Sequence, residues 1–114
     1  MRRVRVTGPA RRDIANALRR SREAFGAPAC ERYRRLFGNA FRNLAEDPVR
    51  PGVRAIHEIR DGYFIYHLKS SARARREAAV RRPRHLIAFF IDDSGDVIVA
   101  RIFHERQLPA RHVD

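Results

Sequence analysis

The spacing of apolar residues predicts that the chain begins with a strand and continues with two helices. Residues 2–7 alternate between apolar and polar positions, which is the period of a half-buried strand. Apolar residues then recur at helical spacing over residues 10–25 and again over residues 28–47. Asp13 lies in the first turn of the first predicted helix, where the helix dipole favours a negative charge. Because residues 26–27 alone separate the two segments, we expect an antiparallel helical hairpin.

The second half of the chain has the pattern of strands. Aromatic and β-branched residues dominate residues 62–68, 85–91 and 97–103, and these segments predict three strands in a meander. A connection with two prolines precedes them, and we expect a short strand within it near residues 53–59. The order of elements favours an α+β fold with an N-terminal strand. In this fold an antiparallel α-hairpin packs on one face of an antiparallel β-sheet.

Length and composition indicate one domain, expected to span residues 1–114 with a basic insertion at 69–83 and a polar tail at 104–114. The longest apolar run is residues 86–91, far short of the roughly 20 residues of a membrane-spanning helix. Cys30 is the only cysteine, which excludes an internal disulfide and a cysteine-based zinc site. Its place on an apolar helical stripe is typical of a small core residue. We therefore expect a cytoplasmic protein with no membrane partner.

Positive charge is the strongest feature of the composition. The chain has 25 basic residues against 13 acidic ones, for a formal net charge of +12. Lys69 is the only lysine, so the other 24 are arginines, which bind phosphate and carboxylate through a planar fork. This excess favours an anionic partner, either an acidic protein or a nucleic acid. A general contribution of arginine to solubility is the alternative explanation.

The histidines offer little support for a metal site. None of the five, His57, His67, His85, His104 and His112, has the spacing of a zinc motif, so we expect no metal and no cofactor. Cleavage of RNA without a metal needs an acid, a base and a cation for the phosphorane. Arg84, Arg101 and His104 lie at the start of one predicted strand and the end of its neighbour, and they are the candidates for such a site.

A series of motifs in fixed order carries a family resemblance. They are residues 10–14 (ARRDI), 25–26 (FG), 32–33 (RY), 47–48 (DP), 84–87 (RHLI), 89–90 (FF), 101–106 (RIFHER) and 109–113 (PARHV). Together they resemble the ParE toxins of the ParE/RelE superfamily of toxin–antitoxin systems. The closing segment is the most specific part of the similarity. The insertion at 69–83 departs from the short turn that most members have.

The resemblance implies a toxin that inhibits DNA gyrase, helps to maintain a plasmid, and is neutralised by a small acidic antitoxin of the ParD type. For the gyrase target, it points to His104, Arg106, Arg111 and His112. For the antitoxin, exposed arginines on the helices are the candidates, namely Arg12, Arg19 and Arg34. RelE-type relatives instead cleave mRNA on the ribosome, which is the alternative function, with Arg84, Arg101 and His104 as the catalytic residues. Direct binding of nucleic acid is a secondary expectation.

Overall fold

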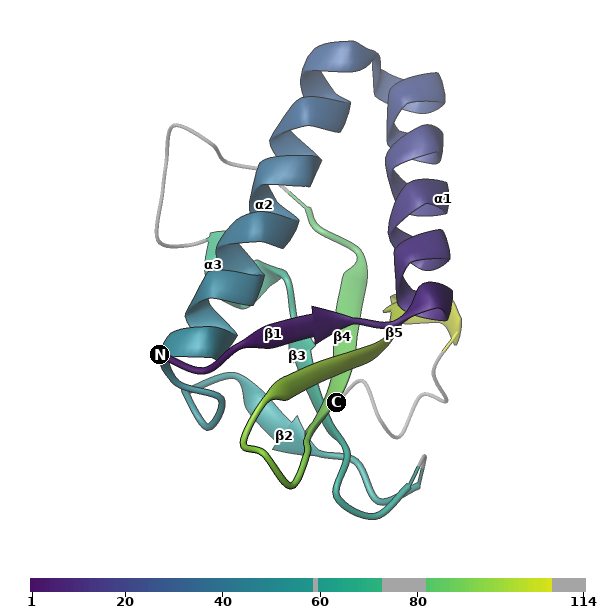
Figure 1. The fold of residues 1–114 in the computed structure, drawn as a ribbon. Helices are drawn as coiled ribbons and strands as arrows, with labels where there is room; N and C mark the ends of the chain where they lie inside the picture. Colours follow the sequence, from purple (N-terminus) through teal and green to yellow (C-terminus); the bar gives the residue numbers. More distant parts are fainter. Residues whose placement is uncertain (59, 73–81, 108–114) are drawn as a thin grey trace.

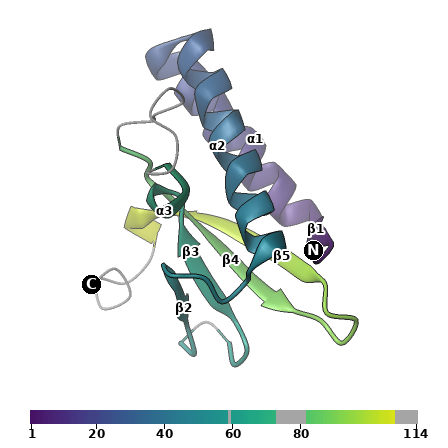
Figure 2. The same cartoon turned by 90° about the vertical axis from the view of Figure 1, so that its left-hand side faces the viewer.

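The computed structural model describes residues 1–58, 60–72 and 82–107, and it contains two long helices and a five-stranded sheet (Figure 1). The elements are, in order, β1 (Val4–Val6), α1 (Gly8–Phe25), α2 (Ala27–Glu46), β2 (Val53–Ala55), β3 (Phe64–His67), the helical turn α3 (Lys69–Ala72), β4 (His85–Ile91), β5 (Val97–His104) and the 3₁₀ turn η2 (Glu105–Gln107). Helices α1 and α2 form a hairpin that stands against one face of the sheet, as the side view shows (Figure 2). The α+β prediction is confirmed.

The sheet has the strand order β1-β5-β4-β3-β2, and it is mixed rather than wholly antiparallel. Strands β2 to β5 pair with antiparallel neighbours, as the meander predicts. Strand β1 instead runs parallel to β5, with Val4 opposite Val97 and Val6 opposite Val99. Alternation of apolar residues shows that a segment is a strand with one buried face, but it carries no information on the direction of the neighbouring strand.

Two residues set the ends of α1: Thr7, which follows β1, and Gly26, which lies in the turn of the hairpin. Thr7 caps its start, since the Oγ1 atom accepts a hydrogen bond from the backbone N–H of Ala10 at 3.2 Å. Gly26 ends it at a φ of 91°, in the left-handed region that favours glycine, and α2 begins at the next residue. Because α1 begins at Gly8, Asp13 lies beyond the first turn, so the expected role at the helix dipole is wrong.

The main core lies between the helical hairpin and the sheet. Helix α2 contributes Tyr33, Phe37 and Leu44, which pack with Ile87 and Phe89 of β4. Cys30 is buried in the same cluster, which confirms its interpretation as a core residue. A smaller buried cluster lies elsewhere in the molecule and consists of Ile56, Ile65, Leu86 and Ala88. Within the described residues, no helix has the length and apolar content needed to span a bilayer.

Along β5, past the residues that pair with β1, side chains from other elements form hydrogen bonds with the backbone groups at the edge of the strand. Thr7 Oγ1 donates to the carbonyl of Ala100 at 2.9 Å. Asp13 Oδ2 accepts from the backbone N–H of Ile102 at 2.9 Å, and the Gln107 side-chain oxygen accepts from the N–H of His104 at 2.6 Å. Helix α1 and the turn η2 are therefore fixed against the last residues of β5, and this places them around one end of the sheet.

A β-bulge decides which side chains of β5 face the helices. Phe89 of β4 lies opposite Val99, whereas Ala88 lies opposite Arg101, so Ala100 is an extra residue on β5. Val99 and Ile102 consequently both join the core beneath the helices, although three positions separate them. His104, two positions after Ile102, follows the same side as Ile102. The bulge thus changes the alternation of β5, so that odd-numbered residues face the helices before it and even-numbered residues face them after it.

The two irregular segments are described only in part. In the expected insertion at 69–83, residues 69–72 form α3, and residues 73–81 lie outside the described residues. In the expected tail at 104–114, His104 ends β5 and residues 105–107 form η2, while residues 108–114 lie outside the described part of the chain. The short strand expected near 53–59 is β2, with three residues.

Candidate functional site

The end of the sheet where β4 begins and β5 ends gathers two of the three residues considered for RNA cleavage. His85 lies opposite His104 across the strand pair, and the carbonyl of Arg84 accepts from the N–H of Glu105 at 2.8 Å. Arg84 and His104 are therefore neighbours, as their positions on adjacent strands predict. Arg101 lies apart from them, because its guanidinium is held by Asp13 of α1, with Nε 2.7 Å from Oδ2.

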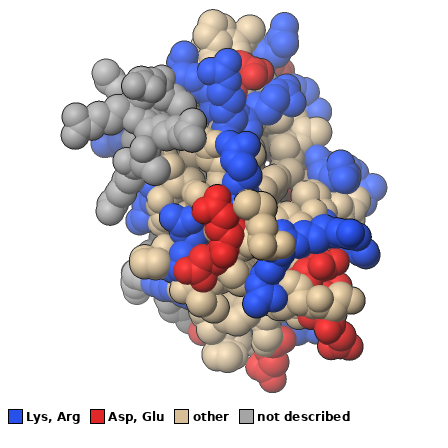
Figure 3. Space-filling view, turned by 60° about the vertical axis from the view of Figure 1, so that its left-hand side comes forward, with Lys and Arg blue, Asp and Glu red and all other residues tan. Residues whose placement is uncertain are grey.

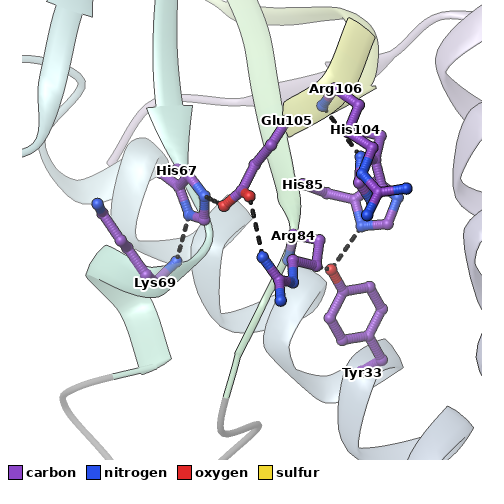
Figure 4. Close-up of polar contacts among 8 residues, drawn as sticks. All are labelled: Tyr33, His67, Lys69, Arg84, His85, His104, Glu105 and Arg106. Carbon is purple, nitrogen blue, oxygen red and sulfur yellow. Dashed lines mark hydrogen bonds and ion pairs between the residues drawn. The ribbon is translucent and has the colours of Figure 1, made fainter. Parts of the chain in front are cut away.

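Glu105 connects two basic residues at this end of the sheet (Figure 4). Its Oε1 lies 2.7 Å from Nε2 of His67, and its Oε2 lies 3.4 Å from a guanidinium nitrogen of Arg84. Burial on its own would raise the pKa of Glu105, but the hydrogen bonds from His67 and Arg84 outweigh it and lower that pKa. Glu105 is therefore a carboxylate that partly neutralises the charge of Arg84.

His67 has a defined tautomer. The backbone N–H of Lys69 donates to Nδ1 at 3.0 Å, so Nδ1 is the acceptor and the proton of the neutral ring is on Nε2. Nε2–H then donates to Glu105. Burial lowers the pKa of His67 more than the carboxylate raises it, in agreement with a neutral ring at neutral pH.

Tyr33 of α2 fixes His85 in the same tautomer. The tyrosine oxygen accepts from the N–H of Arg84 at 3.1 Å, so the hydroxyl is available to donate to Nδ1 of His85, 2.5 Å away (Figure 4). Burial is the main cause that lowers the pKa of His85 to about 4. Burial also raises the pKa of Tyr33 to about 12, so it keeps its proton. His85 is neutral, with its proton on Nε2.

His104 has the same tautomer as His85. The N–H of Arg106 donates to its Nδ1 at 3.1 Å, and its ring meets that of His85 edge to face with centroids 5.2 Å apart. Burial lowers the pKa of His104, and the nearby charge of Arg106 lowers it further. Both rings therefore present an Nε2–H group and act as hydrogen-bond donors.

A cavity with a volume of about 310 Å³ lies between α1 and this end of the sheet. Its lining is Asp13, Asn16, Ala17, Arg20, His85, Ile102, His104, Arg106 and Gln107. Sequence reasoning missed the contribution of α1, although the signal was present: Asp13, Asn16, Ala17 and Arg20 are spaced as one face of a helix. Ala17 and Ile102 are buried in its floor, whereas Arg20 and Arg106 are exposed.

The residues expected to contact the antitoxin lie exposed on the helical hairpin. Arg12 and Arg19 are on α1 and Arg34 is on α2. Arg19 lies 3.8 Å from Glu23 and Arg34 lies 3.4 Å from Glu31, both as exposed pairs within one helix. On the face of the molecule in Figure 3, basic side chains are widespread and acidic ones form small groups among them.

Of the residues expected to contact the target, His104 and Arg106 lie at the cavity, whereas Arg111 and His112 fall outside the described residues. Across residues 1–58, 60–72 and 82–107, no group of three or more histidine, cysteine or acidic side chains is placed to hold a metal ion. The chemistry that the described geometry offers is the donation of hydrogen bonds and positive charge.

Comparison with known proteins places the chain in a family. The family model described as "ParE toxin of type II toxin-antitoxin system, parDE" matches residues 4–109. Among solved structures, the fold is similar to a chain of the toxin–antitoxin complex RelBE2 from Mycobacterium tuberculosis, with a TM-score of 0.53 and 24% sequence identity. That match covers 90% of this chain and 96% of the other. None of the curated proteins compared with the chain matches it. Because the family model matches nearly the whole chain, the protein belongs to the ParE toxin family of type II toxin–antitoxin systems.

Proposed function

We propose that this toxin acts by inhibiting DNA gyrase and is held inactive by a small acidic antitoxin of the ParD type. Membership of the ParE family supports an antitoxin partner, as does the similarity to a chain from a toxin–antitoxin complex. Gyrase as the target follows from the resemblance of the closing segment, residues 101–113, to that of ParE toxins. The proposal places the protein in the cytoplasm, where gyrase and a plasmid-encoded antitoxin would both be present.

The observation that carries the choice of gyrase over mRNA is the pairing of two arginines with carboxylates. Arg101 forms a two-pronged pair with Asp13, at 2.7 and 3.1 Å, and Arg84 contacts Glu105 at 3.4 Å. A cation that stabilises a phosphorane must be free to approach it. These contacts therefore reduce the support for the ribonuclease alternative, in which Arg84 and Arg101 act with His104.

The residues proposed to contact gyrase are those of the closing segment. His104 is held by the N–H of Arg106 and by the edge of His85, so it is presented from a fixed position. Arg106 adds an exposed positive charge beside it. Arg111 and His112 belong to the same proposal on sequence alone. The antitoxin is proposed to contact Arg12, Arg19 and Arg34, because an acidic segment lying along the hairpin would meet all three charges.

The test combines two assays on one preparation of the toxin. We expect loss of supercoiling by purified gyrase, and mRNA that remains intact on programmed ribosomes. Arg106→Gln should weaken the inhibition of gyrase by at least about tenfold, because a charge-assisted contact contributes roughly 1.5–3 kcal/mol. Arg22→Gln removes the same charge from the far end of α1 and is the matched control, which should inhibit gyrase like the original protein.

The opposite pattern would overturn the proposal. Cleaved mRNA with normal supercoiling would establish the ribonuclease alternative and direct attention to His104 and Arg84. In that case His104→Gln should abolish cleavage while ribosome binding is retained. Unchanged supercoiling and intact mRNA with a folded protein would also contradict the gyrase proposal.

A further inference from the structure

The cavity between α1 and the end of β5 has an excess of hydrogen-bond donors. Arg20 and Arg106 contribute guanidinium groups that form no ion pair with any described residue. Both groups lie close to the rings, since the charge of Arg20 lowers the pKa of His85 and His104, and that of Arg106 lowers the pKa of His104. The two histidines have Nδ1 occupied and keep Nε2–H as a donor.

Among the side chains that line the cavity, Asp13 and Gln107 have their oxygens in use, and only the amide oxygen of the exposed Asn16 forms no hydrogen bond within the described residues. Asp13 supplies its one carboxylate, and both oxygens of that group bind Arg101, while Oδ2 also accepts from the N–H of Ile102. The side-chain oxygen of Gln107 accepts from the N–H of His104, so the amide NH₂ is the group left for a ligand. A ligand entering this space would therefore meet mainly positive charge and donors, and it would have to supply most of the acceptors.

We propose that this cavity binds a phosphate monoester, with Arg20 and Arg106 contacting the phosphate and the Nε2–H groups of His85 and His104 donating to its oxygens. A phosphate has three terminal oxygens and can accept from all these groups, whereas a carboxylate has two. The planar guanidinium is well suited to bind two of those oxygens at once.

The size of the cavity leaves room for an organic group on the phosphate. The volume of about 310 Å³ is roughly ten times the share of one water molecule in the liquid, so a phosphate alone would leave most of it unfilled. Ala17 and Ile102 provide a small apolar floor for the rest of the ligand. A nucleoside monophosphate has suitable dimensions, and so does the terminal nucleotide of a 5′-phosphorylated strand. This binding would be independent of gyrase and is measured without it.

The test is a titration of the ¹⁵N-labelled protein followed by NMR. The probes are inorganic phosphate, adenosine 5′-monophosphate and unphosphorylated adenosine. We expect inorganic phosphate and adenosine 5′-monophosphate to shift the NMR signals of the ring nitrogens of His85 and His104 and of the amides of Ile102 and Gln107. Adenosine should leave these signals unchanged. Two short single strands of one sequence, with and without a 5′-phosphate, distinguish the sources: binding of the phosphorylated strand indicates a strand end, and binding of the mononucleotide alone indicates a free nucleotide.

Three variants decide whether the cavity is the site. Arg20→Gln and Arg106→Gln should each weaken binding of the mononucleotide about tenfold, since each removes a charge-assisted hydrogen bond. Arg22→Gln is the matched control, because it makes the same charge change two positions further along α1, forms no ion pair within the described residues and does not line the cavity. The expected affinity of this control is that of the original protein.

Several results would overturn the inference. Equal weakening in all three variants would show that general positive charge attracts the probe. Equal binding of adenosine would remove the role of the phosphate. Absence of shifts with any phosphate, or binding of a glutamate-rich peptide with no binding of phosphates, would assign the cavity to another ligand. Because gyrase is absent from these measurements, their failure would leave the gyrase proposal to its own test.

Discussion

Two groups of arginines lie within one end of this molecule and differ in what neutralises them. Arg84 and Arg101 each contact a carboxylate, from Glu105 and Asp13 respectively. Arg20 and Arg106 line the cavity nearby and have no such contact within the described residues. The first pair therefore contributes to folding, and the second pair is available to a ligand or partner. At this end of the sheet, two carboxylates therefore determine which positive charges are paired within the fold and which are left for a ligand.

The largest effect on stability should come from removing Asp13. In Asp13→Ala, Arg101 loses its partner and the N–H of Ile102 loses its acceptor at the edge of β5. We expect the free energy of unfolding to fall by about 2–3 kcal/mol, measured by urea denaturation, because an unsatisfied buried donor costs about 1–3 kcal/mol. Asp93→Ala changes the same charge in an exposed turn and should have little effect. Equal losses in the two variants would contradict a structural role for Asp13.

A smaller loss is expected when Tyr33 is replaced by phenylalanine. Tyr33→Phe keeps the ring in the core but removes the hydroxyl between Arg84 and His85. The free energy of unfolding should fall by about 1–2 kcal/mol. The proton of His85 would also lose its fixed place on Nε2, and NMR of the ring nitrogens should show a mixture of tautomers. Ring signals identical to those of the original protein would show that Tyr33 does not set the tautomer.

Much of this arrangement was predictable from the chain, and the parts that were not have a common physical cause. The strands, the helical hairpin and the proximity of Arg84 to His104 all follow from periodicity and antiparallel pairing. The position of Arg101 does not, because period-two alternation continued from Val97 and Val99 would place Arg101 on the side of the helices. The extra residue Ala100 reverses that assignment and brings Ile102 to the helix side.

The partners of the charged residues were equally hidden from sequence reasoning. Asp13 and Arg101 are 88 positions apart, and His67 and Glu105 are 38 positions apart. No local pattern connects residues at such separations, since their contact depends on how the helix is placed on the sheet. The cavity is assembled in the same way, from one face of α1 and the turn after β5. Four of its nine lining residues are spaced as one face of α1, a signal that sequence reasoning missed, and the tertiary fold brings the other five to them.

The three histidines around Glu105 should make stability depend on pH. Burial lowers the pKa of His85 in the folded protein to about 4, below its usual value of about 6.5. Between these values the unfolded chain binds a proton that the folded protein does not, so stability falls as the pH falls from about 6.5 to about 4. The lowered pKa values of His67 and His104 act in the same direction.

The slope attributable to one such group is at most about 1.4 kcal/mol per pH unit. Urea denaturation at a series of pH values measures it, and His85→Gln should reduce the slope between pH 6.5 and 4. His67 and His104, whose pKa values are also lowered, should leave a residual slope in that variant over the same range. The lowered pKa values of Asp13 and Glu105 act at more acidic pH, where these carboxylates lose their contribution. Stability that rises as the pH falls through this range would contradict neutral histidines at this end of the sheet.

The smallest effect sharpens the comparison between paired and unpaired arginines. Arg19 also contacts a carboxylate, Glu23, but at 3.8 Å and with both side chains more than 60% exposed. Exposed pairs of this kind contribute about 0–1 kcal/mol, and those within a helix about 0.3–0.5 kcal/mol. Arg19→Gln should therefore lower the free energy of unfolding by less than about 0.5 kcal/mol. Arg101→Gln should lower it by more, because Asp13 is partly buried and contacts two nitrogens of Arg101. Measured side by side at low and high salt, the Arg19 effect should vanish as salt increases and most of the Arg101 effect should persist. If the two variants behaved alike, contact with a carboxylate would not by itself distinguish a structural arginine from one that is available for binding. Burial would then have to explain the difference between Arg84 and Arg101 on one side and Arg20 and Arg106 on the other.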